Sequence, residues 1–228
     1  MNDAGADNVE VAVWDWPVRV VHGSIAALVA ALIATGLTGG AAVMEWHMRA
    51  GEALLVLVLF RILWGFAGSR NARFASFVRG PAAVAAYLRS FMHPPRTVHA
   101  THNPMGGWMV VALLVVLLVQ CGLGLFTHDE TITEGPLVKL IGEDLSDLLS
   151  GLHRRGWWVV AALASLHIVA VFWYVVALDE NIVYPMVSGT KILPAAAGRS
   201  SDAAASTPRA IVLLALSAFV VWWTVTRL

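Results

Sequence analysis

The chain has 228 residues, of which 58% are hydrophobic and 13% are charged, and its mean hydropathy is +0.72. About a quarter of the residues of soluble globular proteins are charged, so this composition excludes an ordinary soluble domain. The 15 Lys and Arg balance the 15 Asp and Glu, which leaves no basic excess for nucleic-acid binding. The single cysteine, Cys121, excludes an intrachain disulfide, a Cys-x-x-Cys-His motif, a four-thiolate zinc site and an iron–sulfur cluster.

Five apolar segments are long enough to cross a bilayer, which needs about 20 residues per helix. They cover residues 18–37, 46–66, 106–126, 157–178 and 210–226. The fifth segment is short, but Arg209 and Arg227 flank it and Trp222 and Trp223 can anchor it at an interface. The sequence therefore predicts an all-α integral membrane protein, with a four-helix transmembrane bundle and an additional C-terminal transmembrane helix.

The connections between the segments predict the orientation, because Lys and Arg concentrate in cytoplasmic loops. The connection between segments two and three contains only basic charges: Arg70, Arg73, Arg79, Arg89 and Arg96. The connection between segments three and four is mainly acidic. We therefore expect a cytoplasmic N-terminal tail at 1–12 that lacks signal-peptide features, a transmembrane core at 13–191, a flexible linker at 192–208 and the additional helix at 209–228.

Shorter helices are expected in the connections. Residues 74–91 and 137–152 mix apolar and charged side chains, which is typical of helices at a membrane interface or in solvated loops, and we favour the solvated interpretation. Asn103 and Pro104 precede segment three in the order that favours a helix start, with Asn as the cap.

Four of the eight histidines lie in or at the predicted spans, where an ionisable group is costly and usually functional. His22 is near the inner end of span one, and His167 is well inside span four. His47 and His153 lie at the outer ends of spans two and four. The remaining histidines fall in connections, where solvated side chains are expected: His93, His99, His102 and His128.

The spacing of His153 and His167 predicts paired ligands. Fourteen residues of α-helix return to nearly the same face, with a net rotation of about −40° and a rise of about 21 Å. One helix face thus carries a histidine at each level of the membrane, with His47 level with His153 and His22 level with His167. Two histidines per level fit a zinc or copper site poorly. They fit a non-covalent b-type haem, whose iron takes two axial imidazoles.

Several stretches make the chain resemble the bacterial cytochrome b561 family, in the branch that includes the b-type cytochrome subunits of nickel–iron hydrogenases. The resemblance covers about residues 13–191. It rests on Val13–His22 (VWDWPVRVVH), Trp46-His47, Leu59–Phe66 (LFRILWGF), Gly68–Arg70, Arg73-Phe74, Arg79–Pro81, His102–Gly106 (HNPMG), Gly151–His153 and Leu166–Ala170 (LHIVA).

This resemblance implies a four-helix di-haem core in the bacterial inner membrane, with two haem b. The haem ligands of the family fall on His22, His47, His153 and His167, with His22 and His167 on the inner haem. Electrons would pass between a quinone pool and a soluble or membrane-associated redox protein, either a cytochrome or a dehydrogenase subunit. Gly23 stands where relatives often have Trp, and the fifth helix lies outside the resemblance.

Further residues are predicted to contact these groups. Arginine is the natural partner of a haem propionate, and Arg19, Arg61 and Arg70 are candidates at the inner haem, although Arg70 can also reach the lipid headgroups. Weaker candidates at the outer haem are Arg49, Arg154 and Arg155. His102 is a candidate proton donor to a quinone, since histidine titrates near neutrality.

Two other functions stay open on the sequence. The chain could be only the membrane-anchor cytochrome of a larger hydrogenase or dehydrogenase, without activity of its own. Alternatively, it could be a haem-free protein whose histidines conduct protons or bind a transition metal. Co-purification with a large catalytic partner would identify the first, and a colourless preparation would identify the second.

Overall fold

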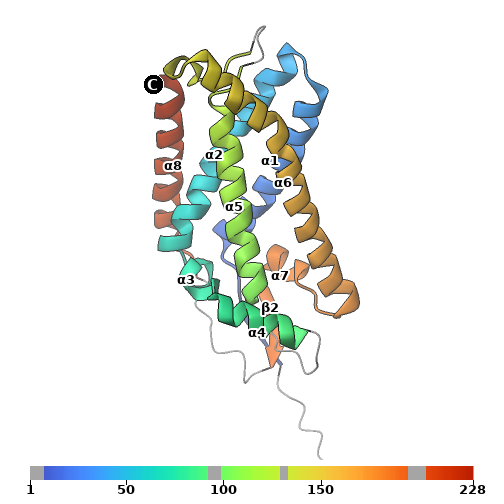
Figure 1. Cartoon of the computed structure of the whole chain (residues 1–228). Coiled ribbons are helices and arrows are strands. Elements are labelled where there is room, and N and C mark those ends of the chain that lie inside the picture. The colour runs from blue at the N-terminus through green and yellow to red at the C-terminus, as the bar shows by residue number, and fades with distance from the viewer. Residues whose placement is uncertain (1–7, 92–98, 129–132, 195–203, 228) are drawn as a thin grey trace, which may run out of the picture. The chain divides into compact units, whose positions relative to one another are not determined.

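The computed structural model describes residues 8–91, 99–128, 133–194 and 204–227, and its course is shown in Figure 1. The long helices are α1 Trp16–Thr38, α2 Ala41–Ala67, α5 Pro104–Gly124, α6 Glu143–Ala177 and α8 Thr207–Arg227. The short helices are α3 Phe74–Phe77, α4 Pro81–Phe91 and α7 Val183–Ser188, with 3-10 turns at Arg70–Ala72 and Val138–Leu140. The strands are β1 Asn8–Ala12 and β2 Thr190–Pro194.

The five long helices are each apolar enough to span a membrane, with mean hydropathies between 1.8 and 2.3 over their best windows. They coincide with the five predicted segments, which confirms an all-α membrane fold. The largest difference is at α6, which begins at Glu143 and runs for 35 residues. A helix of that length measures about 52 Å, so part of it extends beyond a hydrocarbon core of about 30 Å. Glu143 and Asp144 in its first turn favour a helix start there.

The chain divides into two compact units, which are described separately below. The first unit contains Met1–Val20, Trp64–Val111 and His167–Ala210. The second unit contains Val21–Leu63, Ala112–Leu166 and Ile211–Leu228. The helices α1, α2, α5, α6 and α8 contribute residues to both.

In the first unit, the N-terminal strand pairs with a strand that follows the fourth span. β1 is antiparallel to β2, with Val9 opposite Leu193 and Val11 opposite Lys191. The backbone N–H groups of Val13 and Trp14 continue this contact by donating to the Gly189 carbonyl at 2.8 and 3.1 Å. The sequence did not predict these strands, because their pairing joins residues about 180 positions apart.

Asp15 connects the start of α1 to the end of α2 in the same unit. Its Oδ1 accepts a hydrogen bond from the Val18 backbone N–H at 2.8 Å, which is the bond of a helix N-cap. Its Oδ2 accepts one from the Trp64 indole Nε1 at 2.8 Å. Asp15 is 3% exposed and Trp64 is fully buried. These contacts explain why Asp and Trp stand at positions 15 and 64 without any role in chemistry.

Replacing Asp15 with Ala is expected to lower the free energy of unfolding by about 2 kcal/mol or more, because two buried donors lose their acceptor. The change can be measured as a lower apparent Tm by circular dichroism in detergent. Asp15→Asn keeps one acceptor oxygen and should lie between the Ala variant and the wild type. An unchanged Tm in Asp15→Ala would contradict this role for the carboxylate.

The predicted helix start is confirmed at α5, whereas the segment predicted at 74–91 is divided into α3 and α4. α4 begins at Pro81, a residue that suits the first turn of a helix. At α5, the Asn103 Oδ1 accepts a hydrogen bond from the Gly106 backbone N–H at 2.8 Å, as a cap should. Arg209, in the first turn of α8, donates from Nη1 to the Ala67 carbonyl at the end of α2, at 3.0 Å. The fifth helix is thus tied to the second at this end.

Candidate functional site

His47 lies in the first third of α2 and leans on α1, within the second unit. Its Nδ1 is 2.9 Å from the Thr35 Oγ1. That hydroxyl also lies 2.8 Å from the Ala31 carbonyl of its own helix. A carbonyl can only accept, so the hydroxyl donates its proton to Ala31 and accepts from the His47 Nδ1–H. The tautomer that follows has an unprotonated Nε2, which is the atom that can bind a metal.

His153 lies in α6 and leans on α5 in the same way. Its Nδ1 donates to the Gln120 backbone carbonyl at 3.0 Å, since a carbonyl cannot donate. The Gln120 side chain forms a second hydrogen bond between the two residues, because its Nε2 donates to the His153 backbone carbonyl at 3.0 Å. This reciprocal pair holds the imidazole at a defined rotation and again leaves Nε2 as the ligand atom.

The rings of His47 and His153 lie close to each other in the second unit. Their centroids are 6.2 Å apart and their planes are perpendicular. An iron bound at about 2 Å by one nitrogen of each ring, the usual metal–imidazole distance, would separate the centroids by about 6 Å. The two histidines therefore fit the axial positions of a haem, which is the pairing predicted for the outer level.

Glycines give both imidazoles their space. A Cβ at Gly36 in α1 would lie 3.2 Å from the His47 Cε1, and a Cβ at Gly124 in α5 would lie 3.0 Å from the His153 Cε1. Both distances are tighter than ordinary carbon contacts. Gly51, one turn after His47, borders open space, since a Cβ there would meet no atom within 4 Å. The ligand rings are thus confined, while the helix beside His47 leaves room for a flat ring.

The described residues contain no cluster of three or more His, Cys, Asp or Glu side chains that could hold a metal ion. A bare zinc or copper site would need three or four such ligands. A haem needs only two axial ligands from the protein, because the porphyrin supplies the other four nitrogens. The donor set therefore fits a haem iron better than a bare metal ion.

The residues predicted for the inner haem fall into both units. His22, with an exposed side chain, belongs to the second unit, and the half-buried His167 belongs to the first. Their pairing stays a prediction. Arg61 is 7% exposed, whereas Arg70 is exposed.

Arg19 is held in the first unit, where its Nη1 donates to the Ser188 carbonyl at 2.5 Å. Its Nε is buried and has no hydrogen-bond partner in the described part of the chain. An orphaned guanidinium donor of this kind fits a site for an anionic group such as a propionate.

The loop histidines are less solvated than expected. His102 is half-buried between the rings of Trp14 and Phe77, at centroid distances of 4.8 and 4.6 Å. The His128 Nε2 is 2.8 Å from the Asp147 Oδ1 in the outer connection. His99 is half-buried, and burial holds the pKa of its imidazole below the ordinary value, against the raising effect of Glu180. His93 lies outside the described residues.

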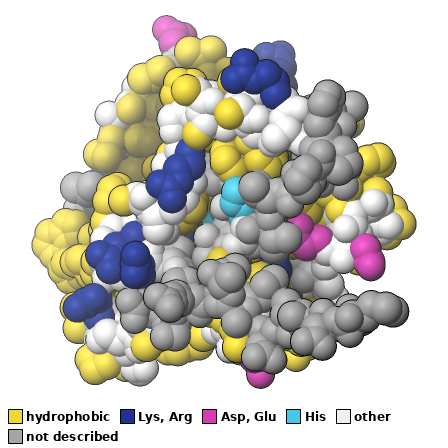
Figure 2. Space-filling model, turned by 90° about the horizontal axis from the view of Figure 1, so that it is seen from below, with side chains coloured by type: hydrophobic (Ala, Val, Ile, Leu, Met, Phe, Trp, Pro, Cys, Tyr) yellow, Lys and Arg dark blue, Asp and Glu magenta, His cyan; other side chains and the backbone are white. Residues whose placement is uncertain are grey.

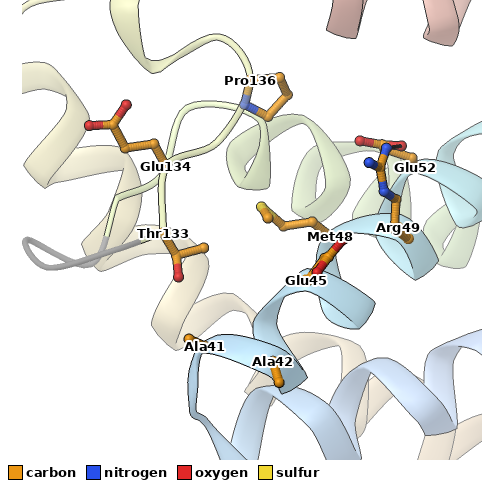
Figure 3. Close-up of a pocket in the computed structure, with 9 residues that line it drawn as sticks. All are labelled: Ala41, Ala42, Glu45, Met48, Arg49, Glu52, Thr133, Glu134 and Pro136. Atoms are coloured by element: carbon orange, nitrogen blue, oxygen red, sulfur yellow. Dashed lines mark hydrogen bonds and ion pairs between the residues drawn. The ribbon is translucent and has the colours of Figure 1, made fainter.

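A pocket of about 660 Å³ lies beside α2 at the same end of the second unit (Figure 3). Glu45, Met48 and Glu52 of α2 line it together with Glu134 of the outer connection. Residues two apart in a helix point about 160° from each other, so Glu45 and His47 lie on opposite faces of α2. The pocket is therefore separate from the space between the two imidazoles.

The arginines predicted at the outer haem gain no support. Arg49 lines the same pocket, and its Nη1 is 3.5 Å from the Glu52 Oε2, with 68% of its side chain exposed. Two residues on from His47, it lies on the opposite face of α2. Arg154 and Arg155 are also exposed.

Four residues of this site were missed by sequence reasoning: Thr35, Gly36, Gln120 and Gly124. A signal was present in Gln120, because an amide inside an apolar span needs a partner. The role of Thr35 could not be recognised from the sequence, since a threonine hydroxyl in a helix readily hydrogen-bonds to a carbonyl of its own helix. The two glycines could not be distinguished from other glycines without knowing which helix each histidine contacts.

The comparisons with known proteins identify the family of the chain. The family model described as prokaryotic cytochrome b561 matches residues 13–189. The chain belongs to the prokaryotic cytochrome b561 family. It is thus a membrane b-type cytochrome, and its cofactor is haem b, which takes part in electron transfer.

Two curated relatives share low identity over most of their length. The "Probable Ni/Fe-hydrogenase B-type cytochrome subunit" of Bradyrhizobium diazoefficiens is 24% identical over 214 residues, covering 79% of this chain and 85% of that protein. The "Probable Ni/Fe-hydrogenase 1 B-type cytochrome subunit" of Escherichia coli K12 is 23% identical over 211 residues, covering 78% of this chain and 88% of that protein. No solved structure gives a significant match.

Proposed function

We propose that this cytochrome binds two haem b and carries electrons across the bacterial inner membrane, between a quinone pool and a redox-protein partner. His47 and His153 would hold the outer haem, and His22 and His167 the inner one. The observation that carries the proposal is the opposed pair of imidazoles 6.2 Å apart, each with its Nδ1 hydrogen-bonded to a neighbouring helix. The haem iron would supply one-electron exchange.

The protein's part in this function is to fix the ligands and to exclude water. Thr35 and Gln120 orient the imidazoles, and the glycines opposite them keep the rings from turning. Arg19 and Arg61 would hold inner propionates, with Arg70 nearer the lipid headgroups. The helices are apolar along most of their length, and a low-dielectric environment of this kind tunes the potential of a buried iron.

Quinone reduction takes up two electrons and two protons, so a site for it also needs a proton source. His102 would serve as that source, because an imidazole held between the rings of Trp14 and Phe77 can deliver a proton without moving far. The neighbouring Asn103, which caps α5, has an amide side chain that does not titrate, so the histidine is the titratable group of this turn.

The orientation proposed places the connection between α2 and α5 on the cytoplasmic side. This connection contains basic residues and no Asp or Glu. Figure 2 looks at the molecule from below the view of Figure 1, and Lys and Arg side chains are visible on that face together with some Asp and Glu side chains. The N-terminus would then be cytoplasmic by the positive-inside rule.

The purified full chain tests this function. A dithionite-reduced minus oxidised spectrum, with haem measured per polypeptide, should give b-type bands and two haems per chain. A short-chain quinol should reduce part of that haem. In this reverse reaction His102 would accept a proton, so His102→Gln should slow the reduction without changing haem content. A colourless, well-folded preparation would instead favour the proton- or metal-handling alternative.

A narrower function is favoured by the curated relatives, since both are named as hydrogenase cytochrome subunits. In that case the chain would be the membrane anchor and electron acceptor of a larger dehydrogenase. Affinity purification of the tagged chain from its native membranes decides between the two. A stoichiometric metalloenzyme in the eluate supports the anchor role, and elution of the cytochrome alone contradicts it.

A further inference from the structure

The two imidazoles of the candidate outer site differ in the group that accepts their Nδ1 proton. For His153 the acceptor is a backbone carbonyl, Gln120 O, at 3.0 Å. For His47 it is the side-chain hydroxyl of Thr35, at 2.9 Å, and the Leu32 backbone is a second hydrogen-bond partner of this imidazole. A backbone carbonyl is present whatever residue stands at position 120, whereas the hydroxyl exists only because position 35 is threonine. The Thr35 hydroxyl is therefore the residue-dependent partner of His47, beside the fixed backbone of Leu32.

The Thr35 hydroxyl is itself oriented by its own helix. Its oxygen is 2.8 Å from the Ala31 carbonyl and 3.2 Å from the Leu32 carbonyl. Its single proton therefore points into the helix and its lone pairs face His47. A chain of two hydrogen bonds results, from the imidazole to the hydroxyl and from the hydroxyl to the carbonyl, and such chains strengthen each member.

We propose that Thr35 is a positioning residue that sets the electron-donating strength of His47, and through it the midpoint potential of the outer haem. The inference rests on the proposed ligation of that haem by His47. A hydrogen bond accepted from Nδ1–H makes an imidazole a more basic ligand. A more basic ligand stabilises ferric over ferrous iron, so the Thr35 hydroxyl lowers the potential.

Thr35→Val tests this because valine keeps the β-branched shape and removes the acceptor oxygen. We expect two haems per chain and a higher midpoint potential for one of them. Loss of the hydrogen-bond partner of a metal ligand commonly changes metal affinity or activity by 10- to 100-fold. A tenfold change in the ferrous-to-ferric ratio corresponds to about 59 mV for a one-electron couple. Potentiometric titration measures the shift, and the low-spin ferric EPR signal reports the altered ligand field.

Two further variants serve as controls. Thr38 stands three residues along the same helix, and its Oγ1 donates to the Ala34 carbonyl at 2.6 Å, so Thr38→Val removes the same kind of back-bonded hydroxyl. No bond from the Thr38 hydroxyl to an imidazole occurs in the described residues, so this variant should leave both potentials unchanged. Thr35→Ser restores an acceptor at the proposed position and should return the potential toward the wild-type value.

The outcomes are separable. An upward shift in Thr35→Val alone, reversed in Thr35→Ser, supports the proposal. Loss of the outer haem in Thr35→Val, with haem retained in Thr35→Ser, supports it as well, because the hydroxyl is then needed to hold His47. Unchanged potentials, equal shifts in Thr35→Val and Thr38→Val, or the same defect in Thr35→Ser overturn it. If His47→Ala retains both haems, the proposed ligation fails instead.

Discussion

Replacing either His47 or His153 with alanine is expected to remove one haem b from each chain, and replacing both should remove no more than one. The reason is geometric, since the two rings lie 6.2 Å apart and would share one iron. With a single axial imidazole, a buried haem loses the ligand that fixes its orientation and most of its affinity. His22→Ala and His167→Ala should each remove the other haem.

Haem per polypeptide, measured by the pyridine haemochrome spectrum on detergent-purified variants, provides the readout. His128→Ala is the matched control, because His128 belongs to the same unit but hydrogen-bonds to Asp147. Its haem content should equal that of the wild type. The outer pairing is wrong if losses from His47→Ala and His153→Ala add up, or if His47→Ala and His22→Ala remove the same haem.

The sequence predicted the long helices well, because a membrane span depends on local properties. A run of about 20 apolar residues has few stable alternatives to a membrane span. Histidines inside such runs are rare enough to be noticed one by one. The Asn103 cap could also be predicted, since a cap involves only residues within one turn of each other.

The surroundings of the histidines could not be predicted, because they depend on how neighbouring helices pack. That His47 contacts Thr35 and His153 contacts Gln120 follows from which helix lies beside which and at what rotation. The hydropathy of a span contains little information about either. Asp15 is another example, since its role at Trp64 joins residues 49 positions apart. Asp15 and Trp64 both lie in stretches that carry the family resemblance, but the sequence could not show that they hydrogen-bond to each other.

Exchanging Gly124 for valine is expected to disrupt the outer haem nearly as much as loss of a ligand. A Cβ at this position would lie 3.0 Å from the His153 Cε1, and valine adds two methyl groups beyond that carbon. The imidazole would have to rotate, which breaks its bond to the Gln120 carbonyl and turns Nε2 away from the iron. Loss of the hydrogen-bond partner of a metal ligand commonly lowers metal affinity by 10- to 100-fold. Displacement of the ligand itself should lower the affinity further.

Gly122 offers a matched control for this change. It lies on the same helix two residues earlier, and a Cβ there would meet no atom within 4 Å. Gly122→Val thus introduces the same β-branched residue near the same helix end, with the same intrinsic effect on helix formation. Haem titration of both variants should show weaker outer-haem binding only in Gly124→Val. Equal affinities would mean that the contact between α5 and His153 does not control ligation, and that the ring can find its position without a glycine opposite it.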